Sequence, residues 1–141
     1  MAERETRQAR EPFSACVNRI EKALATTGIR LEGRIVTSRD EAASQLTGAL
    51  AIPNMADGFQ KWQLPIYHKG PTHLFVTVAE PGATVASHNH EGASTRFIIN
   101  GSIAFAGKQL TAGDWMFIPA NADYSFDVGQ FGAVIAGQYE C

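Results

Sequence analysis

The spacing of hydrophobic residues changes near the middle of the chain. Before about residue 50, apolar residues recur at intervals of three and four, the spacing of one helix face: Phe13, Val17, Ile20 and Leu24. Pro12 suits a first helical turn, and Gly28 suits a helix end. A second, shorter helix is predicted from Ser38, which forms a capping-box pattern with Glu41, to near Gly48. Residues 1–10 are charged and predicted to be frayed.

After residue 72 the pattern changes to short β-branched and aromatic runs separated by glycines. Residues 51–70, rich in Pro and Gly, are predicted to form an irregular connection with one short strand. Strands are predicted at 74–79, 84–90, 95–99, 103–106, 115–118, 124–128 and 133–139. Strands of this length with no helix between them indicate an all-β sandwich or barrel. We therefore expect a helical extension over residues 1–50 and a barrel over residues 51–141.

Composition narrows the class of protein. The 141 residues carry 12 basic and 14 acidic side chains, a net charge of −2, so no basic excess points to nucleic acid. No run of about 18 apolar residues indicates a membrane span, and the N-terminus does not look like a secretory signal. Cys16 and Cys141 form no CxxC motif and are expected to be ordinary thiols. A soluble cytoplasmic protein is the expectation.

His88 and His90 are the candidate metal ligands. Residues two apart on a strand point to the same face, so both imidazoles could hold one metal ion. A bare HxH is weak evidence, because two surface histidines give the same pattern. Its context here is Pro81-Gly82, with five residues between Gly82 and His88.

This context resembles the cupin superfamily. Its first motif runs PG, five residues, HxH, and a later Gly, which matches the sequence from Pro81 to Gly101. The first half of its second motif matches GDWMFIP from Gly113 to Pro119. The resemblance covers about residues 72–140. It implies a mainly β fold, a single jelly-roll barrel with an N-terminal helical extension.

The resemblance to the cupin metal site is incomplete. The family's usual ligands are three histidines and a glutamate, but the glutamate position falls on Ser94 or Thr95 and the last histidine position on Tyr124. Three readings stay open: a metal with replacement ligands, a barrel that binds a small ligand by hydrogen bonds, and a structural barrel with a vestigial pair.

The replacement ligands have three candidates. Tyr124 comes first, because a phenolate is a competent ligand, and it is also the candidate proton carrier. His73 comes next, at the start of the preceding strand, with a rim or core histidine as its ordinary interpretation. Small iron cupins that cleave β-diketones take a third histidine where Gln130 falls here. His68 is expected to be a solvated loop residue.

Arg96 is a candidate for substrate binding. Counting by twos places Ser94 and Arg96 on one strand face, and an inward arginine could clamp a carboxylate or phosphate. The alternative is an arginine at an edge or subunit contact. Seven aromatic residues are expected in the barrel core and interface: Phe75, Phe97, Phe105, Trp115, Phe117, Phe126 and Phe131.

The function that these residues favour is a metal-dependent enzyme acting on a small oxygenated substrate with a carbonyl or carboxylate group. The metal would act as a Lewis acid, and iron is the first choice because a dioxygenase-like oxidoreductase needs a redox metal. Zinc, nickel or manganese would suit an isomerase, lyase or cyclase. The alternative is a non-catalytic module that binds a small ligand or metal. The resemblance also implies a homodimer.

Overall fold

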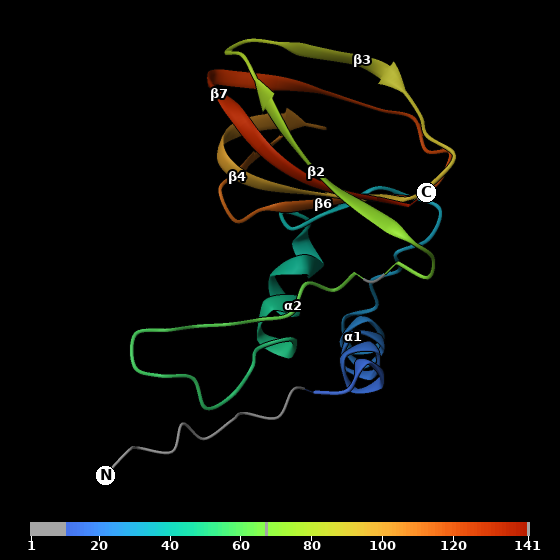
Figure 1. Cartoon of the computed structure of the whole chain (residues 1–141), viewed down its shortest axis with the longest axis vertical. Helices are drawn as coiled ribbons and strands as arrows, with labels where there is room; N and C mark the ends of the chain where they lie inside the picture. The colour runs from blue at the N-terminus through green and yellow to red at the C-terminus, as the bar shows by residue number, and fades with distance from the viewer. Residues whose placement is uncertain (1–10, 67, 141) are drawn as a thin grey trace.

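The computed structural model describes residues 11–66 and 68–140, which form a helical layer beneath one bent antiparallel sheet (Figure 1). The elements in chain order are α1 (Phe13–Thr27), β1 (Val36–Thr37), a 3-10 turn (Glu41–Ala43), α2 (Ser44–Ala49), β2 (Thr72–Ala79), β3 (Thr84–His88), β4 (Ser94–Phe105), β5 (Lys108–Thr111), β6 (Trp115–Ile118) and β7 (Tyr124–Glu140). The expectations for residues 1–10 and Cys141 fall outside the described residues. Of the helices described, none is long and apolar enough to cross a membrane.

The first predicted helix is confirmed, and its end has the expected cause. Gly28 follows α1 with a left-handed φ of 72°, which glycine adopts without steric cost. The apolar face of α1 buries Ile20 and Ala23 against the outside of the sheet. The amphipathic pattern therefore identifies the packed side at Ile20, with Val17 and Leu24 half-buried, but not at Phe13, which is 73% exposed.

The predicted capping box at Ser38 is wrong. The helical segment starts only at Glu41, as a 3-10 turn that leads into α2. The Ser38 hydroxyl instead donates to the carboxylate of Asp114 at 2.9 Å and accepts from the Trp115 backbone N–H at 2.9 Å. Ser38 thus ties the N-terminal segment to the start of β6, a tertiary partner that local sequence cannot reveal.

The sheet has the strand order β1-β6-β4-β7-β2, with β5 added beside β4 and β3 beside β7. All pairings are antiparallel, so the prediction of a mainly β jelly-roll fold with an N-terminal helical part is confirmed. One strand, β1, comes from the predicted helical extension and pairs with β6. Of the predicted irregular segment, Ala51 and Trp62 form an isolated bridge.

Two pairs of predicted strands are single long strands in the structure. Residues 95–99 and 103–105 belong to β4, which ends one residue before the predicted end at 106, and residues 124–128 and 133–139 belong to β7. Glycines that suggested turns are irregular positions within these strands, where Gly101 and Gly132 adopt φ values of 73° and 74°. A Cβ on Gly101 would collide with the carbonyl oxygen of Gly132, so the two strands approach closely here.

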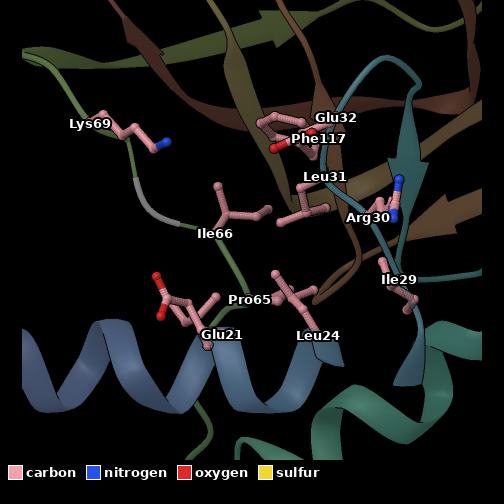
Figure 2. A pocket seen from close by; sticks show the side chains of 11 residues that line it. Glu21, Leu24, Ile29, Arg30, Leu31, Glu32, Pro65, Ile66, Lys69 and Phe117 are labelled. Carbon is pink, nitrogen blue, oxygen red and sulfur yellow. The ribbon is translucent and has the colours of Figure 1, made fainter. Parts of the chain in front are cut away.

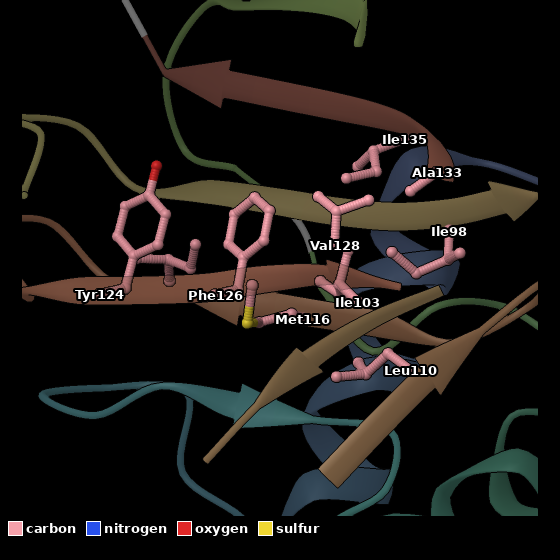
Figure 3. Close-up of a cluster of buried hydrophobic side chains, with 10 residues drawn as sticks. Ile98, Ile103, Leu110, Met116, Tyr124, Phe126, Val128, Ala133 and Ile135 are labelled. Atoms are coloured by element: carbon pink, nitrogen blue, oxygen red, sulfur yellow. The ribbon is translucent and has the colours of Figure 1, made fainter. Parts of the chain in front are cut away.

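Hydrophobic residues form two cores, one on each side of the sheet. The inner core fills the barrel, where alternate residues of β7 point inward in a row, Tyr124, Phe126 and Val128 (Figure 3). The outer core joins α1 and α2 to Trp115 and Phe117 of β6. Of the seven aromatic residues expected in core or interface, Trp115, Phe117 and Phe126 are buried, whereas Phe75 and Phe131 are exposed by 55% and 85%.

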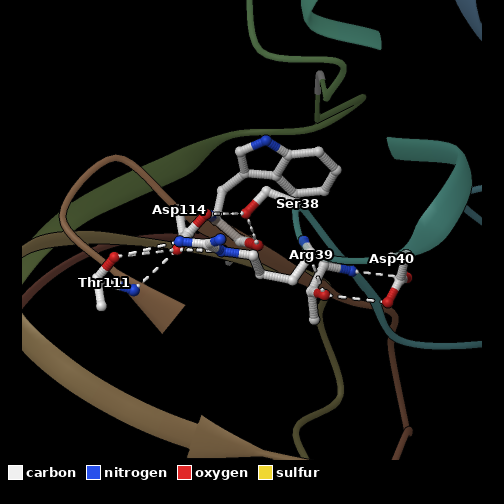
Figure 4. Close-up of polar contacts among 7 residues, drawn as sticks. Ser38, Arg39, Asp40, Thr111 and Asp114 are labelled. Atoms are coloured by element: carbon white, nitrogen blue, oxygen red, sulfur yellow. Dashed lines mark hydrogen bonds and ion pairs between the residues drawn. The ribbon is translucent and has the colours of Figure 1, made fainter. Parts of the chain in front are cut away.

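A polar network fastens the N-terminal segment to the barrel (Figure 4). The Asp114 carboxylate accepts hydrogen bonds from Ser38 Oγ, from Arg39 Nε at 2.9 Å and from the Thr111 backbone N–H at 2.8 Å. Partial burial acts to raise the pKa of Asp114, but these hydrogen bonds outweigh it and hold the pKa below the usual 3.8. The network therefore stabilises the ionised carboxylate.

We expect Asp114→Ala to lower the free energy of unfolding by about 2 kcal/mol, because it leaves several partly buried donors without an acceptor. Urea denaturation followed by circular dichroism measures this. The matched control is Asp127→Ala on an exposed position of β7, expected to change stability by at most about 0.5 kcal/mol. Equal losses in both variants would contradict a special role for Asp114.

The same network predicts an acid-dependent stability. Because the folded-state pKa of Asp114 lies below 3.8, its contribution is present above pH 3.8 and lost as the pH falls through the folded-state value. The stability difference between the wild type and Asp114→Asn should therefore shrink on acidification below pH 3.8. A difference that is constant down to about pH 2 would show that the carboxylate charge is not involved.

Candidate functional site

Four of the predicted site residues meet at one end of the barrel. His88 ends β3 and pairs with Tyr124, the first residue of β7. His90 lies two residues beyond the end of β3, so the predicted strand over 84–90 is too long. Arg96 points inward from β4 and is 7% exposed. The strand pairing thus gathers residues that lie up to 36 positions apart.

The two imidazoles lie close together with nitrogen lone pairs available. Their ring centroids are 4.9 Å apart, and the rings are nearly perpendicular. The Nδ1 of His88 is 2.8 Å from the Ala86 carbonyl oxygen, which only accepts, so Nδ1 carries the proton and Nε2 keeps its lone pair. A backbone carbonyl that accepts from one ring nitrogen in this way orients the other nitrogen of a histidine toward a metal ion.

A hydrogen-bonded chain runs from His90 to Arg96. Arg96 Nη2 donates to the Tyr124 hydroxyl oxygen at 2.6 Å, and that oxygen is 3.1 Å from His90 Nε2. Because the guanidinium only donates, the Tyr124 proton is free to point at His90 Nε2. The phenol therefore sits between a fixed positive charge and an imidazole.

Burial and charge shift the pKa values of two groups in this chain. Burial raises the pKa of the Tyr124 phenol, and the Arg96 charge opposes this only in part. The pKa of His90 is lowered, first by partial desolvation and then by the neighbouring His88 and Arg96. At neutral pH the site thus offers a protonated phenol and a neutral His90.

Arg96 is a buried cation with no carboxylate partner in the part of the chain that the structure describes. Its guanidinium lies 5.4 Å from the Tyr124 ring centroid and 4.9 Å from that of Tyr139. None of the ion pairs within residues 11–66 and 68–140 involves Arg96, and its Nε is buried with no hydrogen-bond partner. Ser94 Oγ, two residues earlier on the same face, is likewise buried and unpartnered.

The structure does not bring the other candidate ligands to the histidine pair. The His73 ring lies 6.3 Å from Phe75, and among the described residues no group of three or more His, Cys, Asp and Glu side chains could hold a metal ion. Gln130 is exposed, six residues along β7 from Tyr124, which is about 20 Å on a strand. His73 and Gln130 therefore lie outside the cluster.

The donor set fits a metal ion held by few protein ligands. His88 and His90 offer imidazole nitrogens, and the Tyr124 oxygen is close enough to His90 to act as a third donor. Imidazole nitrogens suit iron, nickel and zinc alike. A set this small would leave several coordination positions to substrate or water.

Comparisons with known proteins concern the fold alone. No family model matches the chain, and no curated protein matches it in sequence. An RmlC-like cupin from Shewanella frigidimarina is 22% identical, with a TM-score of 0.44, over 48% of this chain and 64% of that one. A protein of unknown function with a cupin-like fold from Ralstonia eutropha is 18% identical, with a TM-score of 0.46, over 52% of this chain and 49% of that one. The chain therefore spans less than two thirds of the length of either.

A salicylate 1,2-dioxygenase from Pseudoaminobacter salicylatoxidans is 15% identical, with a TM-score of 0.43, over 49% of this chain and 20% of that one. Structures that match in fold thus include a dioxygenase as well as a protein of unknown function. The fold of this chain is established by its own strand pairings, described above. The activity printed for such a protein describes that protein and is not assigned to this chain.

Tyr139 is a site residue that the sequence analysis missed. Its ring covers one side of Arg96 and lies 6.4 Å from the His90 ring. A Cβ on Gly137 would stand 2.6 Å from the Tyr139 ring, so glycine makes room for it. The signal in the sequence was parity, since Ile135, Gly137 and Tyr139 alternate along one predicted strand.

The expectation for His68 is wrong. Its side chain is 3% exposed, with Nδ1 3.2 Å from Glu140 Oε1 and Nε2 3.2 Å from Thr95 Oγ1. Its two partners come from the far end of the chain and from β4, so the local loop sequence could not reveal the burial. These contacts attach the segment before β2 to the sheet.

A cavity lies away from the histidines, between α1 and the outside of the barrel (Figure 2). Its volume is about 580 Å³. Its walls are mainly apolar, with four charged residues among them: Glu21, Arg30, Glu32 and Lys69. None of His88, His90, Arg96 and Tyr124 lines it. It is therefore a separate place where a small molecule could bind.

We expect His90 in metal-free protein to titrate below 6.5, and Arg96→Met to raise this pKa by removing a nearby positive charge. Nitrogen-15 NMR of the imidazole rings across a pH series measures both. Arg34→Met is the matched control, because Arg34 is exposed in the loop before β1. Titration of His90 at or above 6.5 in the wild type would contradict the assigned environment.

Proposed function

We propose that this protein is a metal-dependent enzyme acting on a small oxygenated substrate with a carbonyl or carboxylate group. The observation that supports it best is the pairing of His88 and His90, with Nε2 of His88 oriented by the Ala86 carbonyl, beside the Tyr124 phenol and the buried Arg96. A metal-binding pair, a proton donor and a cation within one cluster are the parts that such a reaction requires.

The metal would be held by His88 and His90, with Tyr124 as an additional candidate donor. Iron is the first choice, and zinc, nickel and manganese are the alternatives. When bound, the ion would supply Lewis-acid polarisation of a substrate oxygen, and iron would also permit oxygenase chemistry. His73 stays a weaker candidate, because its ring contacts Phe75 rather than the pair.

Tyr124 is proposed as the group that delivers a proton. Burial keeps the phenol protonated at neutral pH, and the hydrogen bond from Arg96 stabilises the phenolate that remains after the proton leaves. In the structure the Tyr124 hydroxyl donates its hydrogen bond to His90 Nε2, so its proton is not directed at a substrate. If His90 Nε2 held the metal ion, it would no longer accept this hydrogen bond, and the Tyr124 proton would be available to a substrate oxygen.

The proposal predicts one equivalent of metal per chain in protein purified without chelator, and its loss in the double variant His88→Ala/His90→Ala. Plasma mass spectrometry measures the metal content. The fold should persist in the variant, because barrel stability comes from apolar burial rather than from the ion. Circular dichroism checks this. His73→Ala tests the weaker candidate ligand, and we expect it to retain the metal because the His73 ring contacts Phe75 rather than the pair.

The outcome also sorts the reaction class. Iron directs the assays to oxygen uptake with dicarbonyl and aromatic acid substrates, whereas zinc, nickel or manganese directs them to isomerase, lyase or cyclase reactions. Wild-type protein that binds none of these metals on reconstitution overturns the proposal.

A second candidate is a non-catalytic module that binds a small ligand. The cavity of about 580 Å³ beside α1 favours it, since its apolar walls and charged residues suit an amphipathic molecule. The metal experiment discriminates between the two candidates. Metal-free protein after reconstitution would make this cavity the principal site.

We propose further that the protein forms a homodimer through β2. This strand lies at the edge of the sheet, and its eight residues, Thr72–Ala79, contain no charge and no proline. Leu74, Val76 and Val78 share one face and are exposed by 75%, 63% and 77%. Phe131, exposed by 85%, lies with Val78 along one shallow hollow of the same surface.

A second copy is the occupant that this surface fits. Uncharged long edge strands pair readily, and natural monomers protect such edges with charges, proline or bulges. Antiparallel pairing of β2 with its own copy would be symmetric and closed, and the absence of charge avoids repulsion between the copies.

We expect Val76→Lys to convert the dimer to a monomer, because two lysines would be buried near the two-fold axis. Light scattering coupled to size-exclusion chromatography measures the mass. Thr84→Lys, on an exposed position of β3, is the control and should remain dimeric. A monomeric wild type at all concentrations would refute the dimer.

A further inference from the structure

Among the described residues, no carboxylate pairs with the Arg96 guanidinium. Arg96 is 7% exposed, and within residues 11–66 and 68–140 it takes part in no ion pair. Its Nε and the hydroxyl of Ser94 are both buried without a hydrogen-bond partner, on the same face of β4. Buried charges in proteins are normally paired, and buried donors normally find acceptors. Two unpaired donors on one face of β4 therefore indicate a ligand with acceptor oxygens.

The chemistry of the site favours a carboxylate. Arg96 Nε and Ser94 Oγ supply donors from one strand, and a carboxylate has two oxygens that accept from such a pair. The Tyr124 and Tyr139 rings flank the guanidinium, and Phe75 lies 5.4 Å from the Tyr139 ring. The surroundings thus suit a carboxylate attached to an apolar or aromatic group.

The same arginine bears on metal binding. Two hydrogen bonds, of 2.6 and 3.1 Å, lead from Arg96 Nη2 through the Tyr124 oxygen to His90 Nε2. A metal ion on His90 would therefore face the positive charge of Arg96 at short range. Because His90 itself is exposed, this repulsion is strongest at low ionic strength. A carboxylate on Arg96 removes that repulsion.

We infer that Arg96 and Ser94 form a carboxylate site, and that carboxylate and metal bind to this cluster cooperatively. This inference rests on the proposed metal site at His88 and His90, and it names the substrate class as a carboxylic acid. Before the acid binds, the positive charge of Arg96 lowers the affinity of the cluster for the metal ion. By thermodynamic linkage, the metal then raises the affinity for the acid by the same factor.

Isothermal titration calorimetry of the wild-type protein tests the inference without any variant. Zn²⁺ is titrated alone, with benzoate, and with benzyl alcohol, which has a similar shape but no charge. We expect benzoate to raise the Zn²⁺ affinity about tenfold and benzyl alcohol to leave it unchanged. An equal affinity in all three titrations overturns the cooperativity.

Variants then assign the effect to its residues. Arg96→Met should raise the Zn²⁺ affinity in the absence of benzoate and abolish the benzoate effect, whereas a purely structural role predicts a loss of Zn²⁺ binding. Ser94→Ala should weaken benzoate binding with little change in Zn²⁺ affinity. Arg34→Met, at an exposed position, is the control and should behave as the wild type. Circular dichroism confirms that each variant is folded.

The two proposals fail in different ways. Protein that binds benzoate through Arg96 but no metal overturns the proposed function and the cooperativity, and leaves the carboxylate site. Protein that binds Zn²⁺ through His88 and His90 but no benzoate overturns the carboxylate site alone. Benzoate binding that persists unchanged in Arg96→Met also overturns it.

Discussion

The closure of β7 around Arg96 is the constraint on which the site depends. Tyr124 begins this strand and Tyr139 lies next to its end, about 50 Å away if the strand were straight. Both rings nevertheless flank the same guanidinium, because β7 bends while it pairs along its length with β4. A slip of one residue between β4 and β7 would turn Arg96 to the outer face, so the register of this one pairing determines whether a site exists.

Much of the fold follows from the sequence, and its errors have a common cause. Short β-branched and aromatic runs separated by turn residues identified the strands, and the intervals of three and four identified α1. The predicted strand ends at glycines are wrong where a glycine is an irregular position within a strand rather than a turn, as Gly101 is in β4. Ser38 shows the same limit for helices, since its hydroxyl is engaged by Asp114 and Trp115, 76 and 77 residues away.

The site was predictable to the extent that it depends on strand parity. The HxH spacing identified His88 and His90, although His90 lies beyond the end of β3, and counting by twos gave the inward direction of Arg96 as one of two alternatives. The meeting of Tyr124 with Tyr139 did not, because it results from the curvature of the sheet, which parity does not encode. The burial of His68 likewise depends on Thr95 and Glu140, which only the closed barrel brings to it.

The close approach of Gly101 and Gly132 sets a limit on how this sequence can diverge. Both residues have left-handed φ values, a Cβ on Gly101 would strike Gly132, and one on Gly132 would stand 2.7 Å from the Ala79 carbonyl oxygen. Substitution at either position would push apart the strands that close the barrel. The histidines of the site can therefore be exchanged without disturbing this contact, whereas both of these positions require glycine for the barrel to close.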